Sequence, residues 1–111
     1  MAPSRTPHRS PLPKRLREAR ARLGLSQASL GIEAGLDPSV ASTRINQYEQ
    51  GVHNPGYPTV AQLAAALKVP VPYLYSADDK IAMLLLRVSG LSEKELGTLD
   101  EWLSFRGHPK L

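Results

Sequence analysis

Apolar residues recur along this chain at the spacing of one helical face. Ala19 and Leu23 follow Leu16 by three and seven positions. The same kind of repeat returns three more times before residue 68. Such spacing places side chains on one side of a helix. With Gly and Pro as breaks, the pattern predicts four helices, over residues 14–23, 27–34, 38–50 and 58–67.

Capping residues sharpen two of these predicted starts. Ser26 offers a hydroxyl that can cap the second helix, and Asp37 followed by Pro38 predicts the start of the third. Gly51 closes that third helix. The proline-rich stretch that follows the fourth helix allows only a short helical turn over residues 72–74.

The last third of the chain predicts two further helices, over residues 78–88 and 92–106. Ser92 and Glu95 have the spacing of a capping box at the start of the second. No segment alternates apolar and polar residues as a strand does. We therefore predict an all-α fold.

The two C-terminal helices carry more apolar surface than a pair of short helices can bury. An exposed apolar patch of this kind often marks an interface. The sequence predicts a dimerisation surface there, and the alternative is that both helices pack back on the same domain. The residues that carry this prediction are Leu84, Leu85, Leu86 and Trp102.

Positive charge is concentrated at the N-terminus. Residues 1–22 hold seven Lys/Arg and one Glu, a net charge of +6, so the remainder carries −2 of the total of +4. The sequence predicts a flexible, basic, Pro-rich arm over residues 1–13, a domain over 14–76 and the helical pair over 77–111. A basic segment suits phosphate, although a merely solvated charge run is the alternative.

Composition argues against catalysis, metal binding and membrane insertion. There is no Cys, and His8, His53 and His108 have no acidic neighbour at a metal-ligand spacing. The apolar runs are too short to span a bilayer. We therefore expect a cytoplasmic protein that is not an enzyme and uses no cofactor or metal.

Several short segments between residues 16 and 74 resemble the Xre/Cro-type family of phage and bacterial repressors. They read Leu-Arg-Glu-Ala-Arg at 16–20, Gly-Leu-Ser-Gln at 24–27, Ala-Gly-Leu at 34–36 and Ile-Asn-Gln-Tyr-Glu-Gln-Gly at 45–51, with Leu30, Asn54-Pro55 and the 63–67 stripe. The resemblance implies a five-helix, lambda-repressor-like helix-turn-helix domain that binds DNA. It also implies a structural role for Glu49.

The segment between Gly35 and Glu49 departs from that family. It is about four residues longer, close to one helical turn. Residues 38–41 either lengthen the recognition helix at its N-terminal end or enlarge the turn before it.

The outer face of the third helix is the predicted base-reading surface. If Ala41, Ile45 and Tyr48 face the core, the polar residues between them face outward. Arg pairs with guanine, and Asn or Gln with adenine, in a major groove wide enough for a helix. The candidates are Ser42, Thr43, Arg44, Asn46 and Gln47, with an ordinary solvated face as the alternative.

A second group of residues is predicted to contact phosphate. Gln27 opens the second helix, where exposed N–H groups suit an anion, and the resemblance implies the same clamping role. His53 and Asn54 follow the third helix, although turn formation explains them equally well. The set is Gln27, Ser39, His53, Asn54 and Arg17.

Together these features predict a transcriptional regulator, a repressor that binds double-stranded DNA at a short palindromic operator as a homodimer. The alternative is a protein-interaction module, such as an antitoxin or an anti-repressor partner, that uses the same fold. Arg44, Asn46, Gln47 and the basic N-terminus favour DNA, because an interaction module does not need them.

Overall fold

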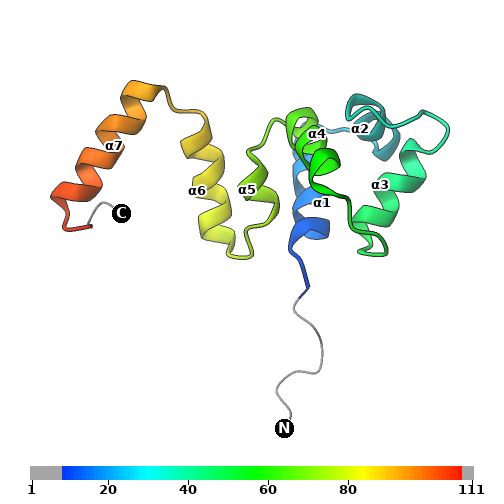
Figure 1. Ribbon diagram of the computed structural model, residues 1–111, viewed down its shortest axis with the longest axis horizontal. Helices are drawn as coiled ribbons and strands as arrows, with labels where there is room; N and C mark the ends of the chain where they lie inside the picture. Colours follow the sequence, from blue (N-terminus) through cyan, green and yellow to red (C-terminus); the bar gives the residue numbers. More distant parts are fainter. Residues whose placement is uncertain (1–8, 109–111) are drawn as a thin grey trace, which may run out of the picture.

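The computed structural model describes residues 9–108, and every regular element in that range is helical (Figure 1). The all-α prediction is therefore confirmed. Helices α1 to α5 form the body, and α6 and α7 follow it toward the C-terminus (Figure 1). The elements are α1 (Leu12–Leu23), α2 (Gln27–Glu33), α3 (Ala41–Glu49), α4 (Tyr57–Leu67), α5 (Val71–Leu74), α6 (Asp79–Ser89) and α7 (Glu93–Phe105).

Helix α1 begins two residues before its predicted start. Pro13 lies in its first turn, where the missing N–H of proline costs nothing because that position has no helical partner. Ser10 accepts a hydrogen bond from the Leu12 N–H through its hydroxyl, at 3.1 Å. At the other end Gly24 adopts φ 69°, the left-handed conformation that terminates many helices.

The predicted start of the third helix at Asp37 and Pro38 is wrong. Helix α3 begins at Ala41, and the preceding residues form a turn closed by the Val40 N–H and the Asp37 carbonyl at 3.0 Å. Asp37 accepts hydrogen bonds from the backbone N–H (2.8 Å) and hydroxyl (2.6 Å) of Ser39. Its carboxylate therefore stabilises the turn instead of capping the helix. The extra residues enlarge the turn between α2 and α3.

The core lies where α1, α3, α4 and α5 meet, and it is built from the predicted apolar faces except Leu23, which is 40% exposed at the end of α1. Each of these helices contributes two or more buried side chains, α2 adds Leu30, and Ala34 directly after α2 is buried with them. The fully buried large side chains include Leu16, Ile45, Leu63, Leu67, Tyr73 and Leu74.

Helices α2 and α3 approach each other at Gly31. A Cβ at this position would lie 2.7 Å from the Ala41 Cβ and 3.0 Å from the Ala41 Cα. Both residues are buried. Only glycine permits this separation, so the pair sets how closely the two helices pack.

Arg15 joins α1 to the start of α6. It is buried, and its guanidinium donates to the Ser76 carbonyl (2.8 Å), the Ala77 carbonyl (3.3 Å) and the Glu18 carboxylate (2.8 Å). A further ion pair joins it to Asp79 at 2.9 Å. Donation from Arg15, and then from Lys14, lowers the pKa of Asp79, so that carboxylate stays ionised.

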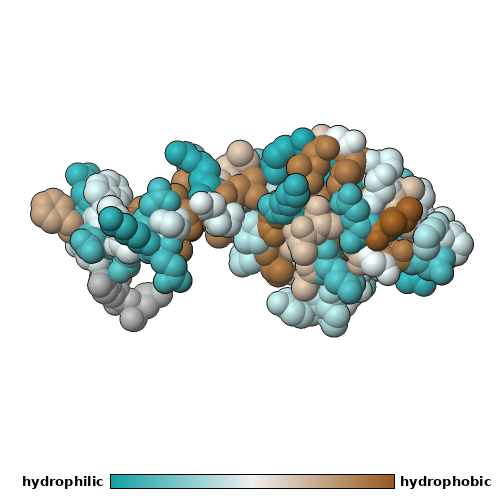
Figure 2. All heavy atoms as spheres, turned by 90° about the horizontal axis from the view of Figure 1, so that it is seen from above, coloured by the Kyte–Doolittle hydropathy of each residue, from teal (hydrophilic) through white to brown (hydrophobic). Residues whose placement is uncertain are grey.

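The two C-terminal helices differ in how they meet the body. Ala82 of α6 is fully buried in the core, and Leu85 and Leu86 pack against it. Helix α7 buries none of its residues and lies at the end of the molecule farthest from α2 and α3 (Figure 1). Figure 2 shows the same division as a broad body joined to a narrower end. No helix in the described range is long and apolar enough to cross a membrane.

The capping box predicted at the start of α7 is confirmed. The Glu95 N–H donates to the Ser92 hydroxyl at 3.1 Å, and the Ser92 N–H donates to the Glu95 carboxylate at 2.9 Å. The predicted helix 78–88 is α6, shifted by one residue because Asp78 caps it by accepting from the Ile81 N–H.

Replacement of Gly31 by alanine should destabilise the protein. The added methyl group has no room against Ala41, and overpacking of this kind costs about 1–3 kcal/mol. Gly97→Ala is the matched control, because nothing lies within 4 Å of that site on α7 and alanine is the better helix former by about 1 kcal/mol. Urea unfolding should show Gly31→Ala less stable and Gly97→Ala no less stable than the parent. Equal stability of all three would contradict the close approach of α2 and α3.

Candidate nucleic-acid interface

Helix α3 has one buried and one exposed face, as the pattern predicted. Ala41, Ile45 and Tyr48 are buried, so the residues between them point away from the core. The candidate base-reading residues all lie on the other side: Ser42, Thr43, Arg44 and Asn46 are exposed and Gln47 is half-buried. The surface they form carries one positive charge and no negative charge.

Glu49 is the exception on this helix, because it is charged and yet only 2% exposed. Arg20 of α1 donates to its carboxylate twice, from Nε to Oε2 at 2.6 Å and from Nη2 to Oε1 at 3.0 Å. The hydrogen bond to Glu49 outweighs desolvation and raises the pKa of Arg20. The structural role that the resemblance implied for Glu49 is thus visible as a bidentate link between α1 and α3.

Gln27 at the start of α2 completes this contact. Its Nε2 donates to Glu49 Oε1 at 3.1 Å and to Asn46 Oδ1 at 3.2 Å. The side chain predicted to contact phosphate therefore uses both of its amide protons within the protein.

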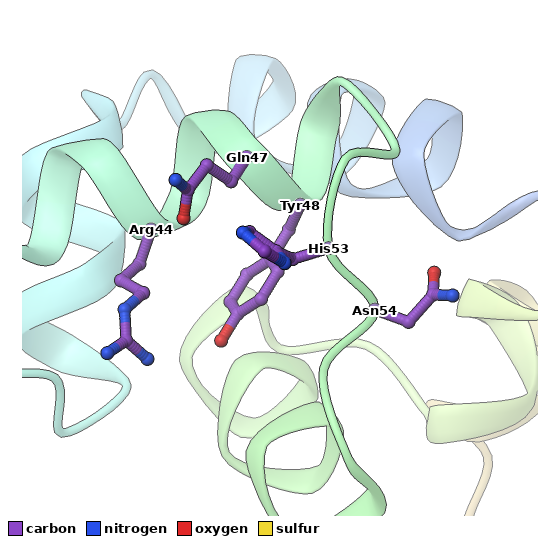
Figure 3. A pocket seen from close by; sticks show the side chains of 5 residues that line it. All are labelled: Arg44, Gln47, Tyr48, His53 and Asn54. Carbon is purple, nitrogen blue, oxygen red and sulfur yellow. The ribbon is translucent and has the colours of Figure 1, made fainter.

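A cleft of about 500 Å³ lies beside α3. Arg44, Gln47 and Tyr48 line it from the helix, and His53 and Asn54 line it from the following loop (Figure 3). Gly51, at φ 74°, lets the chain turn back, and the Gln47 carbonyl accepts from the Val52 N–H at 3.0 Å. Figure 3 shows that the Asn54 side chain points away from Arg44.

A larger cleft of about 700 Å³ separates the start of α1 from the end of α3. Its walls include the basic residues Arg9, Lys14 and Arg17, and Asn54 from the opposite side. Lys14 also forms an exposed ion pair with Asp79 at 3.2 Å. The sequence predicts that the basic N-terminal segment suits phosphate, but it does not place Arg9 and Lys14 in this cleft.

Not every N-terminal arginine is available to a ligand. Arg15 and Arg20 are held in the contacts already described, whereas Arg22 is exposed, with its guanidinium 5.7 Å from the centre of the Tyr73 ring. Arg17 is exposed and donates weakly to the Glu49 carbonyl at 3.3 Å.

One predicted phosphate contact, Ser39, lies outside both clefts and beside a negative charge. Ser39 sits in the turn before α3, where its hydroxyl donates to Asp37. Donation from the Ser39 hydroxyl, then from its N–H, lowers the pKa of Asp37. The resulting carboxylate would repel a phosphate at Ser39. His8 lies outside the described residues.

The predicted dimerisation residues divide into two pairs. Leu84 and Trp102 are 45% and 55% exposed, whereas Leu85 and Leu86 are half-buried against the core. An open groove of about 410 Å³ runs along α7, with Leu91, Leu99 and Trp102 among its walls. Between residues 9 and 108, no cluster of three His, Asp or Glu could hold a metal ion.

Replacement of Glu49 by glutamine should weaken the fold strongly. Arg20 would keep its charge in a site that is mostly buried and lose its counter-charge, at a cost of about 3 kcal/mol. Glu33→Gln, on the exposed end of α2, is the matched control and should be neutral in urea unfolding. The double replacement of Arg20 and Glu49 by Met should recover part of the loss, because it leaves no unpaired charge. Equal stability of Glu49→Gln and Glu33→Gln would show that the link does not hold the fold.

Comparison with known proteins agrees with this geometry. The sequence matches the helix-turn-helix domain family over residues 12–73. The crystal structure of the transcriptional regulator BswR is 40% identical to the chain, with a TM-score of 0.80 over 88% of this chain and 99% of that one. The complex of the SinR and SinI proteins gives a TM-score of 0.61 at 22% identity over the same shares, a likeness that shows the fold alone. No curated protein sequence matched.

The family match spans more than half of the chain, and the identity to BswR extends over most of it. The chain therefore belongs to the helix-turn-helix family of DNA-binding regulators, as its resemblance to the Xre/Cro type predicted.

Proposed function

We propose that this protein is a sequence-specific transcriptional repressor that inserts α3 into the major groove of a short palindromic operator. The observation that carries this proposal is the exposed face of α3. It offers hydroxyl, amide and guanidinium groups without a carboxylate, and base edges are read by groups of these types.

The base contacts are assigned to the residues that this face presents. Asn46 and Gln47 lie near its centre, with Thr43 one turn earlier, and their amide and hydroxyl groups can bond to base edges. Arg44 and Ser42 lie on its two flanks, because a step of about 100° per residue brings them closer to the buried side of the helix than Thr43, Asn46 and Gln47. Arg44 shares its cleft with His53, so its long side chain can reach either a guanine or the neighbouring phosphate.

The phosphate contacts are assigned to the clefts on either side of the loop after α3. Arg17 and Asn54 share the larger cleft with Arg9 and Lys14, and His53 borders the smaller one. Contacts of this class position a protein on the duplex and carry no sequence information themselves. The repressor role rests on the resemblance to Xre/Cro-type repressors.

A homodimer through α6 and α7 would match the palindromic operator. The exposed Leu84 and Trp102 and the groove along α7 provide apolar surface, and Trp is a frequent interface anchor. A two-fold dimer would present two copies of α3 to half-sites about 34 Å apart, one turn of the duplex.

The DNA-binding part of the proposal predicts selection of a sequence and a steep salt dependence. From a pool of random duplexes, the protein should enrich a palindrome. Its affinity should fall with a log–log slope of about 0.9 for each phosphate that it neutralises. Gln47→Ala should relax preference at one base pair, whereas Arg87→Ala, an exposed change on α6, should not. A salt-independent affinity, or no binding to the pool at low salt, would refute DNA readout.

Removal of residues 91–111 tests the dimer. Every core residue in the described range precedes residue 91, so the shortened protein should fold. Sedimentation should show a dimer for the full chain and a monomer for the shortened one, with weaker operator binding and unchanged half-site preference. Trp102→Asp should act like the truncation, and Glu101→Ala, its exposed neighbour, should not.

A full chain that stays monomeric at high micromolar concentration would contradict the dimer. The same groove could then serve a partner protein, which is the use that an antitoxin or anti-repressor partner would make of it.

A further inference from the structure

Three side chains form a continuous line of hydrogen bonds from the core to the surface of α3. It starts at the buried Glu49, passes through the half-buried Gln27 and ends at the exposed Asn46. The two links measure 3.1 Å and 3.2 Å, and both use the Nε2 atom of Gln27 as donor.

The chemistry of Glu49 fixes the direction of this line. An ionised carboxylate can only accept hydrogen bonds, and Arg20 holds this one by two donations at 2.6 and 3.0 Å. Gln27 must therefore turn its amide nitrogen, and not its oxygen, toward Glu49.

The second proton on that nitrogen then fixes the rotation of the Asn46 side-chain amide. It points at the Asn46 side chain, where only an oxygen can accept it. The opposite rotation would place two nitrogen donors face to face, and the hydrogen bond between the two side chains would be lost. The Asn46 Oδ1 therefore faces Gln27, and its Nδ2, a donor only, is left for a ligand.

We propose that Glu49 and Gln27 act as positioning residues for base recognition, by fixing Asn46 as a hydrogen-bond donor toward one base. This inference rests on the proposed DNA readout by α3. An unconstrained Asn pairs with adenine through both of its amide atoms. Here the oxygen is engaged inside the protein, and the preferred edge is one rich in acceptors.

Guanine and cytosine differ clearly in the groups that they present to such a donor. Guanine presents two acceptors in the major groove, N7 and O6, whereas cytosine presents only its N4 amino group, itself a donor. The line of hydrogen bonds therefore favours guanine at the contacted position and disfavours cytosine. On this assignment Gln27 determines sequence preference and is not a phosphate ligand.

The test uses the full-length protein and four duplexes. A duplex selected by the protein from a random pool identifies the contacted base pair as the one where Asn46→Ala loses its preference. The four duplexes then differ only at that pair. The parent should bind the guanine duplex at least about tenfold more tightly than the cytosine duplex, within the range of a good base contact.

Two substitutions test whether Gln27 acts on base preference through the line of hydrogen bonds or by contacting the DNA directly. Gln27→Met keeps the size of the side chain but has no donor, and it should reduce the guanine-to-cytosine ratio to below about threefold. Gln62→Met, at an exposed site on α4, is the matched control and should leave the ratio unchanged. Asn46→Asp keeps an acceptor for Gln27 and exposes a second one, so it should shift preference toward cytosine, whose N4 group donates.

The outcomes distinguish this inference from the proposed function. A parent protein that binds no duplex refutes the DNA readout and this inference together. A parent that binds selectively, with a ratio that survives Gln27→Met, refutes the hydrogen-bond line alone. Equal weakening of all four duplexes by Gln27→Met assigns Gln27 to phosphate and also refutes it.

A measurement on the protein without DNA tests the first link. Side-chain amide protons of Gln27 should exchange with water more slowly in NMR spectra than those of the exposed Gln62. Equal exchange rates would show that the link to Glu49 is absent.

Discussion

The buried carboxylate of Glu49 is the constraint that fixes the position of α3, and with it the position of the exposed polar face of that helix. A charge that is nearly removed from water is stable only when its acceptor sites are filled, and here they are filled from two other helices. Arg20 of α1 binds both oxygens and Gln27 of α2 binds one. The position of α3 is thus fixed against both helices that flank it, so its exposed polar face cannot rotate freely.

Packing supplies the second constraint, at the opposite end of α3. The contact of Gly31 with Ala41 leaves no space for a larger side chain, so the start of α3 is held close to α2. The longer turn before Ala41 is stabilised separately by Asp37 and Ser39. The residues before Ala41 therefore form a turn with its own hydrogen bonds, and the start of α3 is held by its packing against α2.

A second arginine, the buried Arg15, connects the domain with its C-terminal extension. Arg15 binds the backbone carbonyls that precede α6, and Ala82 then enters the core. Helix α6 is therefore firmly attached to the body while its outer side remains apolar and exposed. Helix α7 buries none of its residues, and the capping box of Ser92 and Glu95 stabilises its start. This arrangement suits a surface that is completed by another chain.

The sequence by itself determined the number of helices, most of their apolar faces and the outward position of the polar residues of α3, because helical periodicity is a local property. Local signals misplaced the start of α3, since Asp37 followed by Pro38 is compatible with both a cap and a turn. Only the tertiary structure decided which charged and polar side chains already have hydrogen-bond partners within the protein. Arg15, Arg20 and Gln27 look like exposed polar residues along the chain, and the partners that join them to other helices lie between 19 and 64 positions away. The energy of such contacts depends on burial and on distant partners, which no local pattern records.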